Sequence, residues 1–114
     1  IAVDVRDGAV AHKGWLERAQ LTPSVFIESM MRAGAASFLC TDINLDGMLN
    51  GPNLELYRSL IAEFPAARFI ASGGVAQIAD LDHLAATGCS AAVVGKALYE
   101  GRVTMDQIRR FQGK

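Results

Sequence analysis

Four short runs of apolar residues alternate along the chain with longer segments in which apolar positions recur every three or four residues. Short runs of this kind predict buried strands, and the longer periodic segments predict amphipathic helices. The predicted strands are residues 1–5, 37–41, 68–71 and 91–94. Strands that alternate with helices are typical of consecutive βα units, so the sequence predicts an α/β chain with four parallel strands.

Capping residues mark the ends of the predicted helices. The helices are expected to begin at Thr22, at Asn53, at Gln77 or Asp80, and at Thr104. The apolar stripe of the second helix, which Pro65 ends, is Leu54, Tyr57, Leu60, Ile61 and Phe64. Gly34 and Gly88 close the first and third helices, in two similar segments that run from a helix end into a strand. Glycine at that point suits the left-handed conformation that ends many helices.

No linker, low-complexity tract or charge run divides the 114 residues, so residues 1–114 are predicted to form a single unit. Four parallel βα units make either a small open sheet or part of a closed barrel. Ile1 already lies in a predicted strand of the buried type, as if the sequence were entered in the middle of a larger fold. This favours a partial barrel from which an N-terminal part is missing.

The composition excludes several classes of protein. A hydrophobic content of 51% is enough for a globular core and excludes disorder. A net charge of -1 leaves no basic excess for the backbone of a nucleic acid. The longest apolar stretches are far shorter than the roughly 20 residues of a membrane helix, and the first residues lack the pattern of a signal peptide. We therefore expect no nucleic-acid partner, no membrane span and no signal peptide.

The two cysteines, Cys40 and Cys89, lie in strand-like segments without a CxxC motif or a histidine at ligand spacing. We expect both to be reduced core residues, which favours a cytoplasmic location. His12 and His83 have no partner motif and are expected to be structural or surface residues. No metal site is predicted.

Polar residues follow each predicted strand at the point where it ends. They are Asp4, Thr41 with Asp42, Ser72 with Gly73 and Gly74, and Gly95 with Lys96. Because sites in parallel α/β proteins are built at the carboxyl ends of the strands, these residues are expected to share one rim. A carboxylate in an apolar strand, such as Asp4, must be paired, hydrogen-bonded or desolvated in a way that suits proton transfer. The alternative is an Asp4 that caps a neighbouring loop or pairs with Arg6.

The glycines of this rim indicate an anion site. Ser72, Gly73 and Gly74 precede a helix and offer bare backbone N–H groups that could cradle a phosphate. Gly95 and Lys96 strengthen this interpretation, because glycine loops after two adjacent strands form the usual phosphate site of barrels. The alternatives are a tight turn that needs the same glycines without a ligand, and a Lys96 that is only a solvated charge.

Two long loops could also serve the site. Asp46 and Gly47 lie in a loop longer than a minimal βα connection, as functional lids often are, or they form a plain Asp-Gly turn. Trp15, the only tryptophan, lies in another loop and could stack on a planar ring or pack on the rim.

Five linked motifs cover the chain in order. They lie at residues 4–8, at 13–15, at 41–43 with 46–49 and 51–53, at 71–75, and at 94–99 with Gly101. Together they resemble the C-terminal half of the phosphoribosylformimino-aminoimidazole carboxamide ribotide isomerases, the (βα)8-barrel isomerases of histidine biosynthesis. The resemblance implies strands five to eight of a TIM barrel.

The resemblance also implies roles for individual residues. Asp4 would be the general acid of an Amadori rearrangement, whose partner base is an aspartate on a first strand that this chain does not contain. Thr41 and Asp46 would line the reacting sugar, and Trp15 would belong to a mobile loop over the substrate. One of the two phosphates of the ribonucleotide substrate would be held by Gly73, Gly74, Gly95 and Lys96. No metal or organic cofactor is required, because two carboxylates suffice for this proton transfer.

Two other interpretations stay open. One is a catalytically inactive half-barrel or assembly module, which would seek an N-terminal half-barrel or a second copy of itself to close the sheet. The other is a dual-substrate isomerase that also acts on phosphoribosylanthranilate. Such enzymes resemble this chain at 51–53, but their fifth loop carries extra arginine, whereas residues 11–14 here read Ala-His-Lys-Gly.

Overall fold

The computed structural model describes residues 1–11 and 21–113 of the chain. A five-stranded sheet has the order β2-β1-β3-β4-β5. The four parallel strands are β1 (Ala2–Arg6), β3 (Ser37–Asp42), β4 (Arg68–Ser72) and β5 (Ala91–Ala92). The predicted α/β fold with a mostly parallel sheet is therefore confirmed, and this arrangement is that of a partial barrel.

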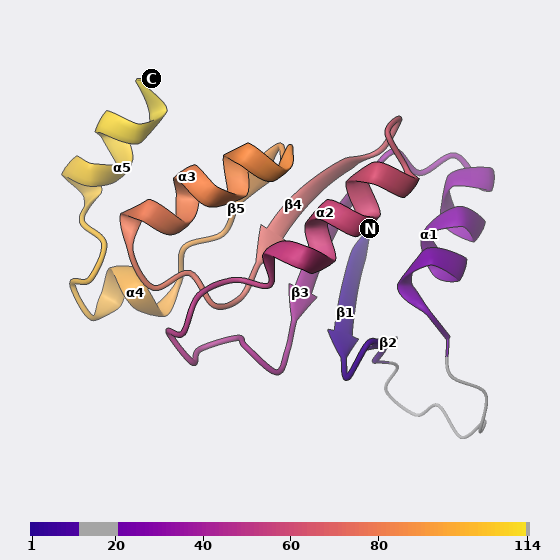
Figure 1. Cartoon of the computed structure of the whole chain (residues 1–114), viewed down its shortest axis with the longest axis horizontal. Helices are drawn as coiled ribbons and strands as arrows, with labels where there is room; N and C mark the ends of the chain where they lie inside the picture. The colour runs from indigo at the N-terminus through magenta and orange to yellow at the C-terminus, as the bar shows by residue number, and fades with distance from the viewer. Residues whose placement is uncertain (12–20, 114) are drawn as a thin grey trace.

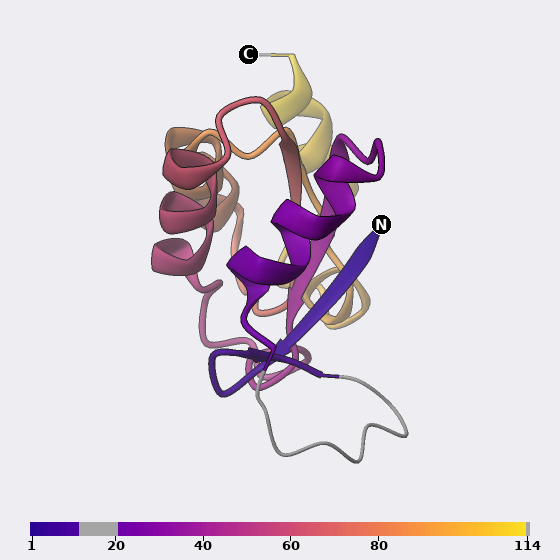
Figure 2. The same cartoon turned by 90° about the vertical axis from the view of Figure 1, so that its right-hand side faces the viewer.

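Three helices connect the parallel strands and two more follow the last strand. The connecting helices are α1 (Pro23–Arg32), α2 (Leu54–Glu63) and α3 (Ile78–Thr87), and the last two are α4 (Lys96–Tyr99) and α5 (Met105–Gln112). Figures 1 and 2 show α2 and α3 side by side against one face of the sheet. The described helices are all too short to cross a lipid bilayer.

The core lies between the sheet and these helices. Alternate residues of β1 are buried and exposed, as a strand with one covered face requires. Val3 and Val5 face the core at 1% and 3% exposure, and Phe38 and Phe69 stack at its centre with ring centroids 5.9 Å apart. The other face of the sheet, which carries Asp4, has no comparable cover from residues 1–11 and 21–113.

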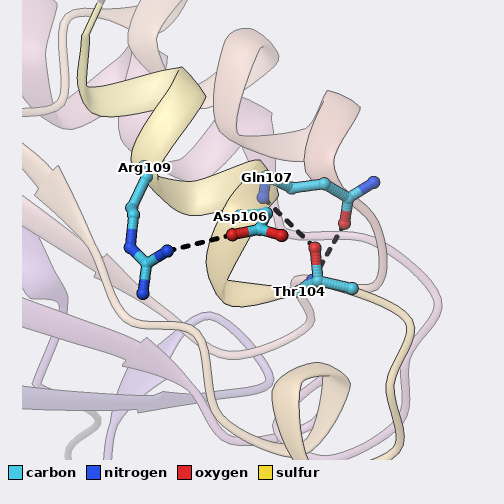
Figure 3. A network of polar contacts seen from close by, with 4 residues as sticks. All are labelled: Thr104, Asp106, Gln107 and Arg109. Atoms are coloured by element: carbon cyan, nitrogen blue, oxygen red, sulfur yellow. Dashed lines mark hydrogen bonds and ion pairs between the residues drawn. The ribbon is translucent and has the colours of Figure 1, made fainter.

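The predicted capping residues are confirmed. The side-chain oxygens of Thr22, Asn53 and Thr104 accept hydrogen bonds from the backbone N–H three residues later, at 3.2, 3.0 and 3.2 Å. At the start of α5, Gln107 also accepts from the Thr104 N–H (Figure 3). Gly34 and Gly88 follow α1 and α3 with φ angles of 106° and 99°, the left-handed conformation that was expected there.

Asp80 is not the start of α3, since it lies in the first turn of the helix. Its buried carboxylate accepts hydrogen bonds from the N–H groups of Ala76 and Gln77, at 2.8 and 3.1 Å. Gln77 is therefore the residue that precedes the helix, and Asp80 neutralises its free N-terminal donors.

One strand was not predicted: β2 (Ala9–Val10) pairs antiparallel with β1. The two residues between these strands, Asp7 and Gly8, have φ angles of 50° and 78°. Positive φ at both central positions is the geometry of a two-residue hairpin turn, for which Asp-Gly is a favoured sequence. The signal was thus present at residues 7 and 8. The short helix α4 was also missed.

Two strand predictions need correction. The predicted strand 91–94 pairs only over Ala91–Ala92, although the Val93 N–H still donates to Ala71 O at 2.8 Å. Val93 is 41% exposed because no described strand covers the outer edge of β5. Ile1 is 54% exposed, since it precedes β1 at the open end of the sheet.

Candidate active site

Three of the predicted site residues lie in one row across the sheet. Asp4 is in register with Thr41, and Thr41 is in register with Ser72. Because side chains in register on parallel strands share a face, all three lie on the face opposite to the core. With about 4.8 Å between neighbouring strands, the row is about 10 Å long. The parallel strands thus place these polar groups on one rim, as predicted.

The surroundings of Asp4 differ from the prediction. Asp4 is exposed, and its carboxylate has no hydrogen bond or ion pair with any described residue. Neither a pair with Arg6 nor a buried position is observed, because odd-numbered residues of β1 face the helices and Asp4 faces away from them. Its backbone is ordered by a bond from the Ala11 N–H to the Asp4 carbonyl oxygen, at 2.7 Å. Asp4 is therefore an accessible carboxylate in the middle of a paired strand.

A cavity of about 110 Å³ lies where the loops after β3, β4 and β5 meet. It exceeds the roughly 30 Å³ that one water molecule occupies in the liquid, so a small anion fits. Six of the predicted site residues line it, namely Asp46, Ser72, Gly73, Gly74, Gly95 and Lys96. Ser72 belongs to both the cavity and the row of polar residues. Asp46, which was expected beside Thr41 at the sugar, lies in the wall of this cavity.

Four backbone N–H groups of the cavity have no hydrogen-bond partner among the described residues. Those of Gly73, Gly74, Gly95 and Lys96 donate to no residue of the described ranges. Gly73 and Gly74 are buried, and buried N–H groups in proteins are almost always hydrogen-bonded to protein, water or ligand. Four free donors in the lining of one cavity make it a candidate site for an anion.

The two glycines after β4 cannot be replaced by larger residues. Their φ angles of 97° and 89° are strained for residues with a side chain. A β-carbon at Gly74 would overlap the carbonyl group of Gly51, and one at Gly73 would approach the Asp42 carbonyl oxygen to 3.0 Å. The Gly51 N–H donates to the Gly74 carbonyl oxygen at 2.9 Å. The loops after β3 and β4 therefore pack backbone against backbone.

Lys96 adds a positive charge to the cavity. Its Nζ donates to the Gly47 carbonyl oxygen at 3.2 Å, a bond that links the loop after β5 to the loop after β3. The ion pairs of the described residues all lie within single helices, so none of them neutralises Lys96. This charge is available to an anion in the cavity.

Asp42 organises the loop that carries Asp46, a role that the sequence analysis did not assign to it. Asp42 is 8% exposed, and its carboxylate accepts from the Asn44 N–H at 3.0 Å and from Asn53 Nδ2 at 2.8 Å. Asn44 also pairs with Asp7, whose N–H donates to the Asn44 Oδ1 at 3.0 Å. A buried aspartate at a strand end, followed eleven residues later by a capping asparagine, is the signal that could have revealed this.

Burial shifts the ionisation of both thiols. The pKa of Cys40 is raised to about 12, mainly by burial and to a lesser extent by the neighbouring Cys89 thiol. Burial also raises the pKa of Cys89, which is only half-buried rather than in the core. Neither cysteine forms a disulfide within the described part of the chain.

No cluster of three or more His, Cys, Asp or Glu side chains that could hold a metal ion occurs among the described residues. Trp15 and His12 lie outside the described residues.

The sequence matches known proteins. Residues 1–104 match the family described as "Histidine biosynthesis protein". A relative from Streptococcus thermophilus is 42% identical over 113 residues, which is 99% of this chain and 47% of the relative. A relative from Bacteroides fragilis is 41% identical over 111 residues, 97% of this chain and 46% of the relative. One from Leuconostoc mesenteroides is 42% identical over 113 residues, 99% of this chain and 48% of the relative.

All three relatives carry the same name, 1-(5-phosphoribosyl)-5-((5-phosphoribosylamino)methylideneamino) imidazole-4-carboxamide isomerase. The chain spans about half the length of these curated relatives. Since the family match covers residues 1–104 of 114, the chain belongs to the histidine biosynthesis protein family.

Proposed function

We propose that this chain supplies the general acid and one phosphate site of an aldose-ketose isomerase that acts on a phosphorylated ribonucleotide. The observation that carries the proposal is the set of four unpartnered backbone N–H groups around a cavity that also holds Lys96. The name of the relatives contains two phosphoribosyl groups, and thus two phosphates. One phosphate in the cavity would place the attached ribose over Ser72 and Thr41, towards Asp4.

The reaction is an intramolecular rearrangement of the ribose. Asp4 donates a proton to the ring oxygen, the bond from that oxygen to C1 breaks, and the substituent nitrogen forms an imine with C1. A base then removes the proton from C2. The resulting enol becomes the ketone as the base returns its proton to C1 and the enol hydroxyl gives its proton to the Asp4 carboxylate. Such proton transfers each contribute about 10²- to 10⁴-fold to the rate.

The remaining residues bind and orient the sugar phosphate. Thr41, between Asp4 and Ser72 in the row, offers a hydroxyl to the ribose. Asp46 accepts hydrogen bonds from sugar hydroxyls at the edge of the cavity, while Gly73, Gly74, Gly95 and Lys96 bind the phosphate. The base is assigned to an aspartate on a strand outside this chain. The roles of Trp15 over the substrate, the absence of a cofactor and the cytoplasmic location stay predictions from the sequence.

Turnover by the full-length protein tests the activity. The expected result is conversion of the relatives' aminoaldose substrate into the aminoketose, with inorganic phosphate as a competitive inhibitor. Conversion of phosphoribosylanthranilate as well would identify the dual-substrate isomerase. A folded full-length protein with no turnover of either substrate would leave the inactive binding or assembly module as the function.

A charge-removal variant tests the phosphate site. Lys96→Met should weaken inhibition by phosphate by on the order of tenfold, because one charge-assisted hydrogen bond is lost. Arg110→Gln removes the same charge from α5 and should leave inhibition unchanged. Equal effects of the two variants would assign the effect to net charge and not to the cavity.

We also propose that a second half-barrel covers the open face of the sheet. Asp4 and Arg6 are exposed there, β5 has an open edge, and unpaired strand edges are templates for pairing. The partner is an N-terminal half-barrel, or a second copy of the chain related by a two-fold axis. Size-exclusion chromatography with light scattering checks this, because a stable monomer at micromolar concentration with no second polypeptide would contradict it.

A further inference from the structure

Tyr57 of α2 is completely buried behind the carboxyl ends of β3 and β4. Its hydroxyl oxygen lies 3.0 Å from the Cys40 carbonyl oxygen and 3.1 Å from the Ser72 carbonyl oxygen, two acceptors that share its single hydrogen. It also accepts a hydrogen bond from the Ser72 N–H at 3.2 Å. A buried tyrosine hydroxyl needs one partner, whereas this one contacts three backbone groups on two strands.

The contact with Ser72 has a consequence for the next residue. The Ser72 carbonyl and the Gly73 N–H belong to the same planar peptide unit and point in opposite directions. Because the hydroxyl holds this carbonyl from the helix side, the Gly73 N–H is directed away from α2 and towards the cavity. Glycine has more backbone freedom than any other residue, so the direction of the Gly73 N–H has to be held by its neighbours.

The hydroxyl stays able to donate across the physiological range. Burial is the main cause that raises the pKa of Tyr57, so the phenol keeps its proton. The Ser72 carbonyl therefore faces a protonated hydroxyl, whose hydrogen it shares with the Cys40 carbonyl.

We propose that Tyr57 is a positioning residue, which fixes the Ser72–Gly73 peptide so that its N–H points at the bound phosphate. The inference rests on the proposed phosphate site in this cavity. Tyr57 itself touches neither the substrate nor the cavity.

The variant Tyr57→Phe, made in the full-length protein, removes the hydroxyl and keeps the ring. We expect the inhibition constant of inorganic phosphate and the KM of the substrate each to rise by on the order of tenfold, the effect of about 1.4 kcal/mol. The kcat should change by less than about twofold, because the acid and the base are untouched. Tyr99→Phe is the matched control: Tyr99 is 89% exposed, and loss of its hydroxyl should change neither constant.

The results distinguish a positioning role of Tyr57 from a purely structural one. A lower Tm with unchanged KM and phosphate inhibition would make Tyr57 a purely structural residue and overturn the positioning role. A variant that does not fold would do the same. If phosphate fails to inhibit even the unsubstituted protein, the proposed phosphate site falls, and the positioning role falls with it. A fall in kcat alone would also contradict the proposal.

Discussion

The two faces of the sheet are built from the same strands and differ in nearly everything else. On the covered face, Val3, Phe38 and Phe69 are at most 1% exposed. On the opposite face, Asp4 and Arg6 are exposed, and Leu39 and Ile70 are only half-buried. Neighbouring residues of a strand point to opposite faces. One residue of a strand can therefore pack in the core while the next residue lies on the face that carries the site. Stability and chemistry are thus separated within single strands.

The largest expected effect comes from the chemical face. Asp4→Asn in the full-length protein should lower kcat by about 10²- to 10⁴-fold with little change in Tm, because a proton donor is lost from an exposed position. Asp106→Asn is the control, since Asp106 is an exposed carboxylate whose only described partner is Arg109 on the same helix (Figure 3). Steady-state kinetics checks this, and an unchanged kcat would remove Asp4 from the mechanism.

Substitutions on the covered face should instead lower the stability of the fold. Phe38→Ala should lower the free energy of unfolding by about 3–5 kcal/mol, since a buried ring and its stacking on Phe69 are lost. Val25→Ala, at a site that is 56% exposed, should change it by less than about 0.5 kcal/mol. Urea denaturation followed by circular dichroism measures both. Equal losses in the two variants would show that the helices do not protect this face.

Alkaline pH should weaken the covered face through Cys40. The pKa of Cys40 is raised by burial from its ordinary value of 9.0 to about 12. Between these values the unfolded chain loses a proton that the folded chain keeps, so the free energy of unfolding falls by up to about 1.4 kcal/mol per pH unit as pH rises. The stabilisation is complete below pH 9, and Tyr57 adds a similar loss at higher pH because its pKa is also raised by burial.

Denaturation curves recorded at several pH values up to 11 check this prediction. Cys40→Ala should make the part of the curve above pH 9 less steep and leave the losses due to Cys89 and Tyr57, whose pKa values are also raised by burial. A free energy of unfolding that stays constant over this range would contradict the burial of both groups.

The smallest expected effect is a difference between the capping residues of two helices, Thr104 at α5 and Asn53 at α2. Thr104→Ala should cost about 1 kcal/mol of stability, the usual value for a lost cap. Asn53→Ala should cost slightly more and raise KM, because Asn53 also donates to the buried Asp42 carboxylate beneath the loop 43–52. Thermal denaturation and kinetics on both variants make the comparison. An unchanged KM in Asn53→Ala would show that this capping residue does not support the site.

The sequence was sufficient for features that depend on local chemistry. The caps Thr22, Asn53 and Thr104, and the left-handed Gly34, were predicted because each acts within one turn of its own helix. The parallel order of the main strands followed from the alternation of strands and helices.

Features that depend on distant contacts were not predictable in the same way. Tyr57 looks like any apolar-stripe residue in the sequence, and only the fold brings its hydroxyl to the backbone 15 residues away at Ser72. Asp46 lines the cavity through the course of the loop 43–52, which its Asp-Gly sequence does not reveal, and its role at the sugar stays a prediction. The exposure of Asp4 depends on which face the helices cover, which the strand pattern alone does not state.

The backbone contact between Gly51 and Gly74 has a consequence for protein engineering. Because the two loops interlock without side chains between them, a change in the length of one displaces the other. Loop exchange between relatives, the usual way to alter specificity in this fold, would therefore require residues 43–52 and 73–76 to be transplanted together. If only one of the two segments were transplanted, its backbone would no longer fit the other loop, and no single substitution would restore the fit.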